Sequence, residues 1–439
     1  MALLEPLAFI VLTAISVWLF SKKVAIIRRN ILLGRKESIN DQPGRRLKNM
    51  LLLALGQKKM FNNPLVALLH LWVYAGFIII NIEIVEIIID GLTGSHRILF
   101  PLLPTLYPYL INSFEVLALL VVLACVIFFI RRNLLQIKRF ISNDLAGWPR
   151  TDANLILITE IVLMSLFLLM NASDTLLQQR VVGHYADHQT GDFLVSSLLH
   201  HWLQPLSDQA LIITERTSWW LHIIGIFAFL NYLPYSKHLH IVLAFPNTYF
   251  AKLQPAGKME NMPSIQQEVL YAMQPELAPT DAAAPPQRFG ARDVMDLSWK
   301  NLMDAYSCTE CGRCSAACPA RQTGKLLSPR KIMMDTRDRL EEVGQQMDRA
   351  GNWQDDGKSL LHTYISTEEL MACTTCNACV EACPVSINPL DIILQLRRNL
   401  VMEESRTPAE WAALFSNVEN NFAPWKFSPD DRDGWTRSA

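Results

Sequence analysis

Five long apolar runs, separated by polar stretches, dominate the first part of the chain. As helices they are long enough to cross the hydrocarbon core of a bilayer, which is about 30 Å thick. The third and fourth runs need their flanks to complete the crossing. The pattern predicts a bundle of five transmembrane helices within residues 1–253. The runs cover 3–20, 64–90, 115–130, 153–170 and 217–235.

The pattern changes after the last apolar run. Residues 254–295 show no sustained periodicity and are rich in proline and alanine, which is typical of an extended linker. Helical signals return in 296–402. There Ser328 precedes Pro329, as an N-cap precedes a first-turn proline, and predicts a helix over 328–343.

Two more helix starts lie near the end of this second region, at T-E-E-L in 367–383 and at Pro389 in 389–402. Helices around both cysteine-containing stretches favour an all-α ferredoxin domain. The fold class expected for the whole chain is therefore all-α. The tail, 403–439, holds three tryptophans that either dock a partner or pack on their own domain: Trp411, Trp425 and Trp435.

Charge orients the predicted bundle. The chain has 40 Lys and Arg against 41 Asp and Glu, so no overall positive field favours nucleic acid. Positive charge is instead concentrated in the loops 22–59 and 131–150. Such loops are expected in the cytoplasm, which puts the N-terminus outside. Glu5 stands where a signal peptide would be basic, so the first run is expected to be a retained span. The prediction is a multi-pass protein of a bacterial cytoplasmic membrane, with the lipid bilayer around 1–253 and the second domain inside.

Eight of the nine cysteines fall into two similar runs, C-T-E-C-G-R-C-S-A-A-C-P and C-T-T-C-N-A-C-V-E-A-C-P. Each has the C-x₂-C-x₂-C-x₃-C-P spacing that binds a 4Fe–4S cluster, with the fourth cysteine ligating the other cluster. Zinc is the main alternative, but two complete runs closed by proline favour iron–sulfur. The reducing cytoplasm suits free thiolates. The expected ligands are Cys308, Cys311, Cys314 and Cys383 for one cluster, and Cys373, Cys376, Cys379 and Cys318 for the other.

Histidines in the apolar region are candidate haem ligands, because polar residues inside a membrane are costly and invite a functional interpretation. His70 lies near the cytoplasmic start of the second run, and His222 and His240 are 18 residues apart. Eighteen residues are five helical turns, so one helix would place this pair on one face about 27 Å apart. His238 would then fall on nearly the opposite face. Pro234 makes this phase approximate.

This arrangement suits one or two b-type haems, with His70 and His240 holding the inner haem. An outer haem at His222 needs a second ligand from the outer segments. The alternative is that His238 and His240 are interfacial residues beside lipid headgroups. The candidates for the second outer ligand are His200, His201 and His96.

Carboxylates in the apolar region could serve a quinone, whose reduction also moves protons. Glu83, Glu86 and Asp90 share one side of the second run. Either Glu83 and Glu86 relay protons or they belong to a solvated helix end, and Asp90 is expected to be wet. Glu160 lies deeper and is expected to pair across the bundle. Cys125, outside both cysteine runs, is expected to be an ordinary buried residue.

The second domain resembles the helical, two-cluster ferredoxin subunit of heterodisulfide reductases, and also the two-cluster part of glycolate oxidase iron–sulfur subunits, through its paired cysteine runs. The apolar region is similar to the gamma, cytochrome b subunit of respiratory nitrate reductases and to the membrane subunit of heterodisulfide reductases. In that cytochrome family the last span carries two histidines, as His222 and His240 do here. Its second span carries two more, of which His70 matches one. The resemblance implies a fusion of the two parts, with a cytoplasmic partner that is a cysteine-rich, heterodisulfide reductase-like protein or a flavoprotein.

Together these features predict a membrane-bound electron-transfer subunit of a respiratory oxidoreductase. It would pass electrons between a cytoplasmic redox partner and the membrane quinone pool through two 4Fe–4S clusters and haem b. The substrate-converting site is expected on the partner, because the chain has neither a C-C-G nor a G-x-G-x-x-G motif. Two alternatives are a haem-free membrane-anchored ferredoxin and an iron–sulfur redox sensor. A sensor would keep its signalling in a His70→Ala variant.

Overall fold

The described part of the chain is helical and contains no named strand, only two isolated bridges. This agrees with the expected all-α class. The computed structural model describes residues 4–135, 137–187, 189–255, 257–279, 288–426, 428–431 and 433–437.

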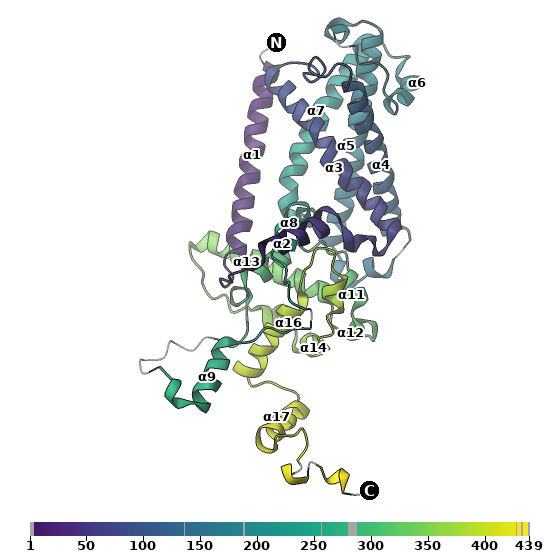
Figure 1. The fold of residues 1–439 in the computed structure, drawn as a ribbon. Helices are drawn as coiled ribbons and strands as arrows, with labels where there is room; N and C mark the ends of the chain where they lie inside the picture. The colour runs from purple at the N-terminus through teal and green to yellow at the C-terminus, as the bar shows by residue number, and fades with distance from the viewer. Residues whose placement is uncertain are drawn as a thin grey trace.

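Each expected apolar run coincides with a long helix. Among the described residues, four helices are long and apolar enough to cross a membrane. The helix of the fifth run, α7, carries Asp208, Glu215 and Arg216 and is not among the four. It nevertheless lies inside the bundle and packs along α5 (Figure 1). The helices are α1 (Leu4–Ile31), α3 (Pro64–Thr93), α4 (Tyr107–Asn133), α5 (Trp148–Gln179) and α7 (Asp208–Tyr232).

The fifth run does not continue as one helix to His240. Helix α7 ends at Tyr232, and two 3₁₀ turns follow before α8 (His240–Tyr249) begins. Pro234 lies in the first of these turns. Proline has no backbone N–H to donate and its ring clashes with the preceding turn, so a helix breaks there. The expectation that His222 and His240 share one helical face is therefore wrong.

The basic loop after α1 folds against the segment that leaves the bundle. It contains α2 (Pro43–Met50), which lies beside α8 (Figure 1). Arg46 of α2 is buried, and it donates to the carbonyl oxygens of Tyr249 at 3.2 Å and Ala251 at 2.9 Å. These bonds fix α2 and α8 together under the helices of the bundle.

The second domain is a set of short helices around one long one. Ser328 caps α13 by accepting from the backbone N–H of Lys331, as predicted, and Ser366 forms a capping box with Glu369 at the start of α14. The core between them is apolar and includes Ile332. The helices are α10 (Trp299–Tyr306), α11 (Arg313–Ala317), α12 (Pro319–Gln322), α13 (Pro329–Ala350), α14 (Thr367–Met371), α15 (Ala378–Ala382) and α16 (Pro389–Arg398).

The segment expected as an extended linker contains a helix, α9 (Pro263–Met273), which has no buried residue. In the tail, α17 (Ala409–Asn421) is also without a buried residue. Both helices project away from the rest of the chain (Figure 1). Packing therefore does not hold either helix on the second domain in this structure.

The second domain packs on the end of the bundle opposite the N-terminus (Figure 1). At the end of α1, the Asn30 amide donates to the Tyr306 hydroxyl at 3.1 Å. Beyond α8, the Asn247 amide donates to the Val385 carbonyl at 2.9 Å. Both contacts are buried. The two parts of the chain thus form a continuous structure at this end of the helices.

Candidate functional site

The two cysteine runs fold into similar loops. In each run, the residue two positions and the residue four positions after the first cysteine adopt a left-handed backbone. In the first run the second of these is Gly312, where an added Cβ would lie 2.5 Å from the Arg330 guanidinium. In the second run it is Asn377, a residue that tolerates this conformation better than most. The short helices α11 and α15 follow these turns and pack against each other.

Four cysteines surround a small cavity between the loops. They are the set expected for the first cluster: Cys308, Cys311 and Cys314 from the first run, and Cys383 from the second. The second run therefore contributes its last cysteine to the first site.

The second expected set shows the reciprocal arrangement. Burial raises the pKa of Cys379 to about 12, with added repulsion from the thiolates of Cys373 and Cys318. Burial likewise raises the pKa of Cys373, again with Cys318 among the neighbouring thiols that contribute. Cys318 of the first run thus lies beside the cysteines of the second.

These thiols fit a cluster better than a single ion. Burying a thiolate is costly unless a metal balances its charge. Among the described residues, no three Cys, His, Asp or Glu side chains converge as closely as the ligands of one ion. A 4Fe–4S cube holds its four thiolates at separate corners, whereas a zinc site draws its ligands around one atom. The wide spacing of the cysteines favours the cube.

The two sites differ in their surroundings. Cys376 of the second set is exposed to solvent. Cys311 of the first set borders a large cavity that extends into the bundle. The first site is thus next to the helices and the second faces away from them.

The large cavity has a volume of about 320 Å³, within the usual range for sites that hold small molecules and cofactors. Three histidines line it: His70 from α3, His238, and His240 at the start of α8. Arg313 and Cys311 reach it from the first cysteine loop. Apolar side chains complete the wall, among them Val73, Phe77, Ile78, Ile241 and Phe245.

The histidine rings are oriented by their Nδ1 atoms. His240 donates from Nδ1 to the Lys237 carbonyl at 3.1 Å, and the Nδ1 of His70 lies 3.0 Å from Oε1 of Gln57. With Nδ1 engaged in this way, Nε2 of each ring is available to ligate a metal. Burial also lowers the pKa of His240, which favours the neutral imidazole that a metal needs.

Two other polar groups of the cavity were not foreseen from the sequence. The Tyr74 hydroxyl is buried and has no hydrogen-bond partner among the described residues. Arg313 brings a permanent positive charge to the same cavity. A signal for each existed, because Tyr74 lies one turn after His70 and Arg313 stands inside a cysteine run. An orphaned hydroxyl and a cation in an otherwise apolar cavity are features of a binding site.

His238 differs from its expected place. It lines the same cavity as His240, and the centroids of the two rings are 5.5 Å apart. The expectation of opposite faces is wrong, because the two residues lie where a 3₁₀ turn meets α8 and not in a regular helix. Burial lowers the pKa of His238 to about 3.

His222 lies in a separate, smaller cavity of about 80 Å³. Its Nδ1 is 2.9 Å from the Leu163 carbonyl. None of the expected second ligands lines this cavity. His200 lies 2.9 Å from the Thr175 hydroxyl, and His96 lies 3.2 Å from Asp174. The structure therefore brings no second histidine to His222 within the described residues.

The three carboxylates of α3 have different environments. Asp90, expected to be wet, is buried, because the loop after α3 folds back and donates the backbone N–H groups of Arg97 and Ile98 to it. Glu86 accepts from the Tyr107 hydroxyl at 2.9 Å. Glu83 is buried, and its Oε2 has no partner in the described part of the chain. Glu83 is therefore the one of the three whose side chain is not used to hold the loop.

Glu160 was expected to pair across the bundle. No hydrogen bond or ion pair joins it to another described residue. Its side chain borders both the His70–His240 cavity and the His222 cavity. The expectation of a partner is wrong within this structure. As expected, Cys125 is buried on α4.

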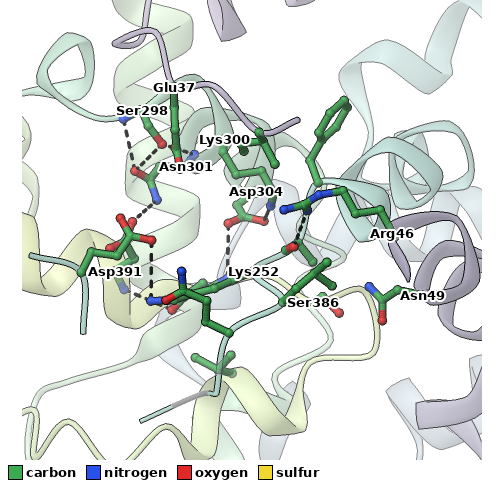
Figure 2. A pocket seen from close by; sticks show the side chains of 18 of the residues that line it. Glu37, Arg46, Asn49, Lys252, Ser298, Lys300, Asn301, Asp304, Ser386 and Asp391 are labelled. Atoms are coloured by element: carbon green, nitrogen blue, oxygen red, sulfur yellow. Dashed lines mark hydrogen bonds and ion pairs between the residues drawn. The ribbon is translucent and has the colours of Figure 1, made fainter. Parts of the chain in front are cut away.

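A polar cleft of about 410 Å³ lies on another side of the second cysteine loop (Figure 2). Its charged groups are paired with one another. Lys300 donates to Asp304 at 2.5 Å, and Asn301 donates to Asp391 at 2.8 Å. These bonds join α10 to α16 and to the loop before α2, so the cleft is explained as a structural seam of the second domain.

Comparisons with known proteins agree with the cysteine pattern. A family described as 4Fe-4S dicluster domain matches residues 307–387, so the chain contains a domain for two 4Fe–4S clusters. Over 99% of its length the chain is 27% identical to the "Probable iron-sulfur-binding oxidoreductase FadF" of Bacillus subtilis, and the match covers 61% of that protein. Over 97% it is 25% identical to the "EtfAB:quinone oxidoreductase" of Syntrophomonas wolfei, covering 58% of that protein.

The second domain has its own relatives. Over 24% of the chain, it is 35% identical to one of the subunits of the ferredoxin:CoB-CoM heterodisulfide reductase of Methanosarcina mazei, covering 52% of that protein. The chain is thus an iron–sulfur, oxidoreductase-like protein homologous to heterodisulfide reductase subunits. It spans about three fifths of the length of the two relatives that match it throughout. No solved structure matches the chain.

Proposed function

We propose that this chain carries electrons between a cytoplasmic redox protein and a membrane quinone, through two 4Fe–4S clusters and a b-type haem. The observation that carries the proposal is the shared cavity: His70 and His240 from the bundle line it together with Cys311 from the first cysteine loop. A haem held there would lie directly beside the first cluster. Electron transfer needs such proximity.

The clusters are assigned as the sequence predicted. Cys308, Cys311, Cys314 and Cys383 hold the first, and Cys373, Cys376, Cys379 and Cys318 hold the second. The position of Cys311 at the cavity and the exposure of Cys376 support an order. The redox partner meets the second cluster, and the first cluster stands between it and the membrane. The partner is proposed to be a heterodisulfide reductase-like or flavin-containing protein.

The haem is assigned to His70 and His240 through Nε2 of each ring. The hydrogen bonds at both Nδ1 atoms support this assignment. Arg313 is placed to pair with a carboxylate of the bound group, and the Tyr74 hydroxyl is placed to donate to it. When bound, haem supplies a one-electron redox centre. A second haem at His222 would need a ligand that the described residues do not bring there.

The membrane orientation is proposed from charge. The basic loops 22–59 and 131–150 contact the second domain at the same end of the bundle, through α2, α8 and Asp144. If those loops lie in the cytoplasm, so does the second domain. All five helices then cross the bacterial cytoplasmic membrane, with α7 as the fifth.

Quinone is proposed as the membrane partner because the relative from Syntrophomonas wolfei is an EtfAB:quinone oxidoreductase. Glu83 and Glu86 were predicted to exchange protons with it. The unpartnered Oε2 of Glu83 supports that role for Glu83. The bonds of Glu86 to Tyr107 and to the Leu99 N–H give it a structural role as well.

Spectroscopy of the purified full chain in nanodiscs tests the proposal. The reduced-minus-oxidised visible spectrum should show the sharp bands of b-type haem, with about eight irons per chain in the clusters. A His70→Ala variant should lose the haem bands and keep the cluster irons. His201→Ala, an exposed histidine outside the cavity, is the matched control and should keep both. Absence of haem bands from the wild-type chain would favour the membrane-anchored ferredoxin instead.

A further inference from the structure

Glu160 stands at the boundary of two cavities in the bundle. It borders the His70–His240 cavity on one side and the His222 cavity on the other, and Phe77 borders both as well. The side chain has no hydrogen bond or ion pair with a described residue. An unpaired carboxylate inside a membrane is expensive, and its persistence points to a function.

The surroundings of Glu160 hold no other carboxylate that could share its proton. The groups that face it can be positively charged, neutral at ordinary pH, or occupied as ligands. From α3, α4, α7, α8 with its preceding turn, and the first cysteine loop respectively, they are His70 and Tyr74, Cys125, His222, His238 and His240, and Cys311 and Arg313. Among these lining residues Arg313 alone has a permanent charge.

A carboxyl in this position responds to the charge of its neighbours. In a poorly solvated site, Coulomb energies between groups a few ångströms apart are several times larger than in water. An electron that arrives in the His70–His240 cavity adds one negative charge beside Glu160. That charge favours the neutral, protonated form of the carboxyl.

We propose that Glu160 is the proton-binding residue of this cavity, resting on the proposed function of the cavity as a redox site. When one electron arrives from the first cluster, the Glu160 carboxylate takes up one proton from water and an O–H bond forms at Oε. When the electron leaves, that bond breaks and the proton returns. The cluster is oxidised by one electron, the group in the cavity is reduced by one, and net charge in the cavity is unchanged.

Redox titration of the full chain in nanodiscs tests this proposal. We expect the midpoint potential of the haem to fall with rising pH between about pH 6 and 8.5, because uptake of a proton accompanies reduction. In Glu160→Gln the potential should be nearly independent of pH, while Glu160→Asp should retain the dependence. Asp208→Asn, which removes an exposed carboxylate at the far end of α7, is the control and should behave as the wild type.

Infrared difference spectra give a second readout that does not depend on the variant folding well. The wild-type chain should gain a protonated-carboxyl C=O band on reduction, and Glu160→Gln should lack it. Intact haem bands with an unchanged pH dependence in Glu160→Gln would overturn this inference alone, as would a wild-type spectrum without a carboxyl band. A wild-type chain without haem bands would overturn the haem assignment first, and this inference with it.

Discussion

Asp144 and Arg330 join the loop between α4 and α5 to the start of α13. The Arg330 guanidinium donates to the two carboxylate oxygens of Asp144 at 2.8 and 3.0 Å. Both side chains are almost fully buried, and Ser328, the N-cap of α13, donates to the same carboxylate at 2.9 Å. Arg330 also donates to the Arg139 carbonyl. The pair therefore connects the bundle to the helix that follows the first cysteine run.

Replacing Asp144 by Asn should destabilise this contact by about 3 kcal/mol, because it leaves the Arg330 guanidinium buried without a counter-charge. Thermal unfolding, followed by loss of the iron–sulfur absorbance, measures the effect. Asp338→Asn on the same helix removes a largely exposed carboxylate and should change the midpoint little. Equal midpoints for the two variants would show that the pair does not hold the domains together.

The same pair should be insensitive to pH over the physiological range. Burial alone would raise the pKa of Asp144, but the hydrogen bonds from Arg330, Ser142 and Ser328 outweigh it and lower the pKa to about 2. A carboxyl with a lowered pKa stabilises the fold above its ordinary value of 3.8 and loses that effect as the pH falls through about 2. The difference in melting temperature between the wild type and Asp144→Asn should stay constant from about pH 8 to 5 and shrink below about pH 4. A difference that already shrinks by pH 6 would contradict this assignment.

Serine variants of the cysteines test the crossed pairing of the two runs. Cys383→Ser lies in the second run but should remove the same paramagnetic cluster signal as Cys308→Ser, and Cys318→Ser should remove the other. Each variant should hold about four irons in place of about eight. Electron paramagnetic resonance of the reduced chain, together with iron analysis, gives the answer. Cys125→Ser, the buried cysteine outside the runs, should retain both signals. Pairing of Cys383 with the second signal would require each run to hold its own cluster.

Removal of the tail from residue 408 onward should leave the rest of the chain intact. Helix α17 has no buried residue, so its loss should change the free energy of unfolding by no more than about 0.5 kcal/mol. Leu396→Ala, which opens a space in the core of the second domain, should cost about 2–5 kcal/mol. Thermal unfolding of both variants makes the comparison. A large loss on removing the tail would mean that its tryptophans pack on the second domain after all.

Local signals in the sequence were sufficient for much of this structure. The apolar runs found the long helices, and Ser328 with Pro329 found the start of α13, because capping depends on residues close together in the chain. The cysteine spacing likewise predicted which thiols would face each other across the two loops, since a short loop offers few arrangements.

Other features depended on contacts that no local pattern contains. Pro234 did more than disturb the phase of a helix: it ended α7 and allowed both His238 and His240 to face one cavity. Asp90 is buried because a loop folds back over it. Glu160 has no partner because cavities flank it, and the position of a cavity follows from the packing of all the surrounding helices.

Contacts at three separate places hold the second domain on the bundle: Asn30 at the end of α1, Asp144 before α5, and Lys237, which pairs with Glu310, before α8. Attachments in three places leave the domain little freedom to swing. An electron that passes between the thiol-lined loops and the helices therefore tunnels over a fixed separation, with no carrier motion to wait for. Raising the solvent viscosity should leave that internal step as fast as before, and it would slow only the encounter with soluble proteins.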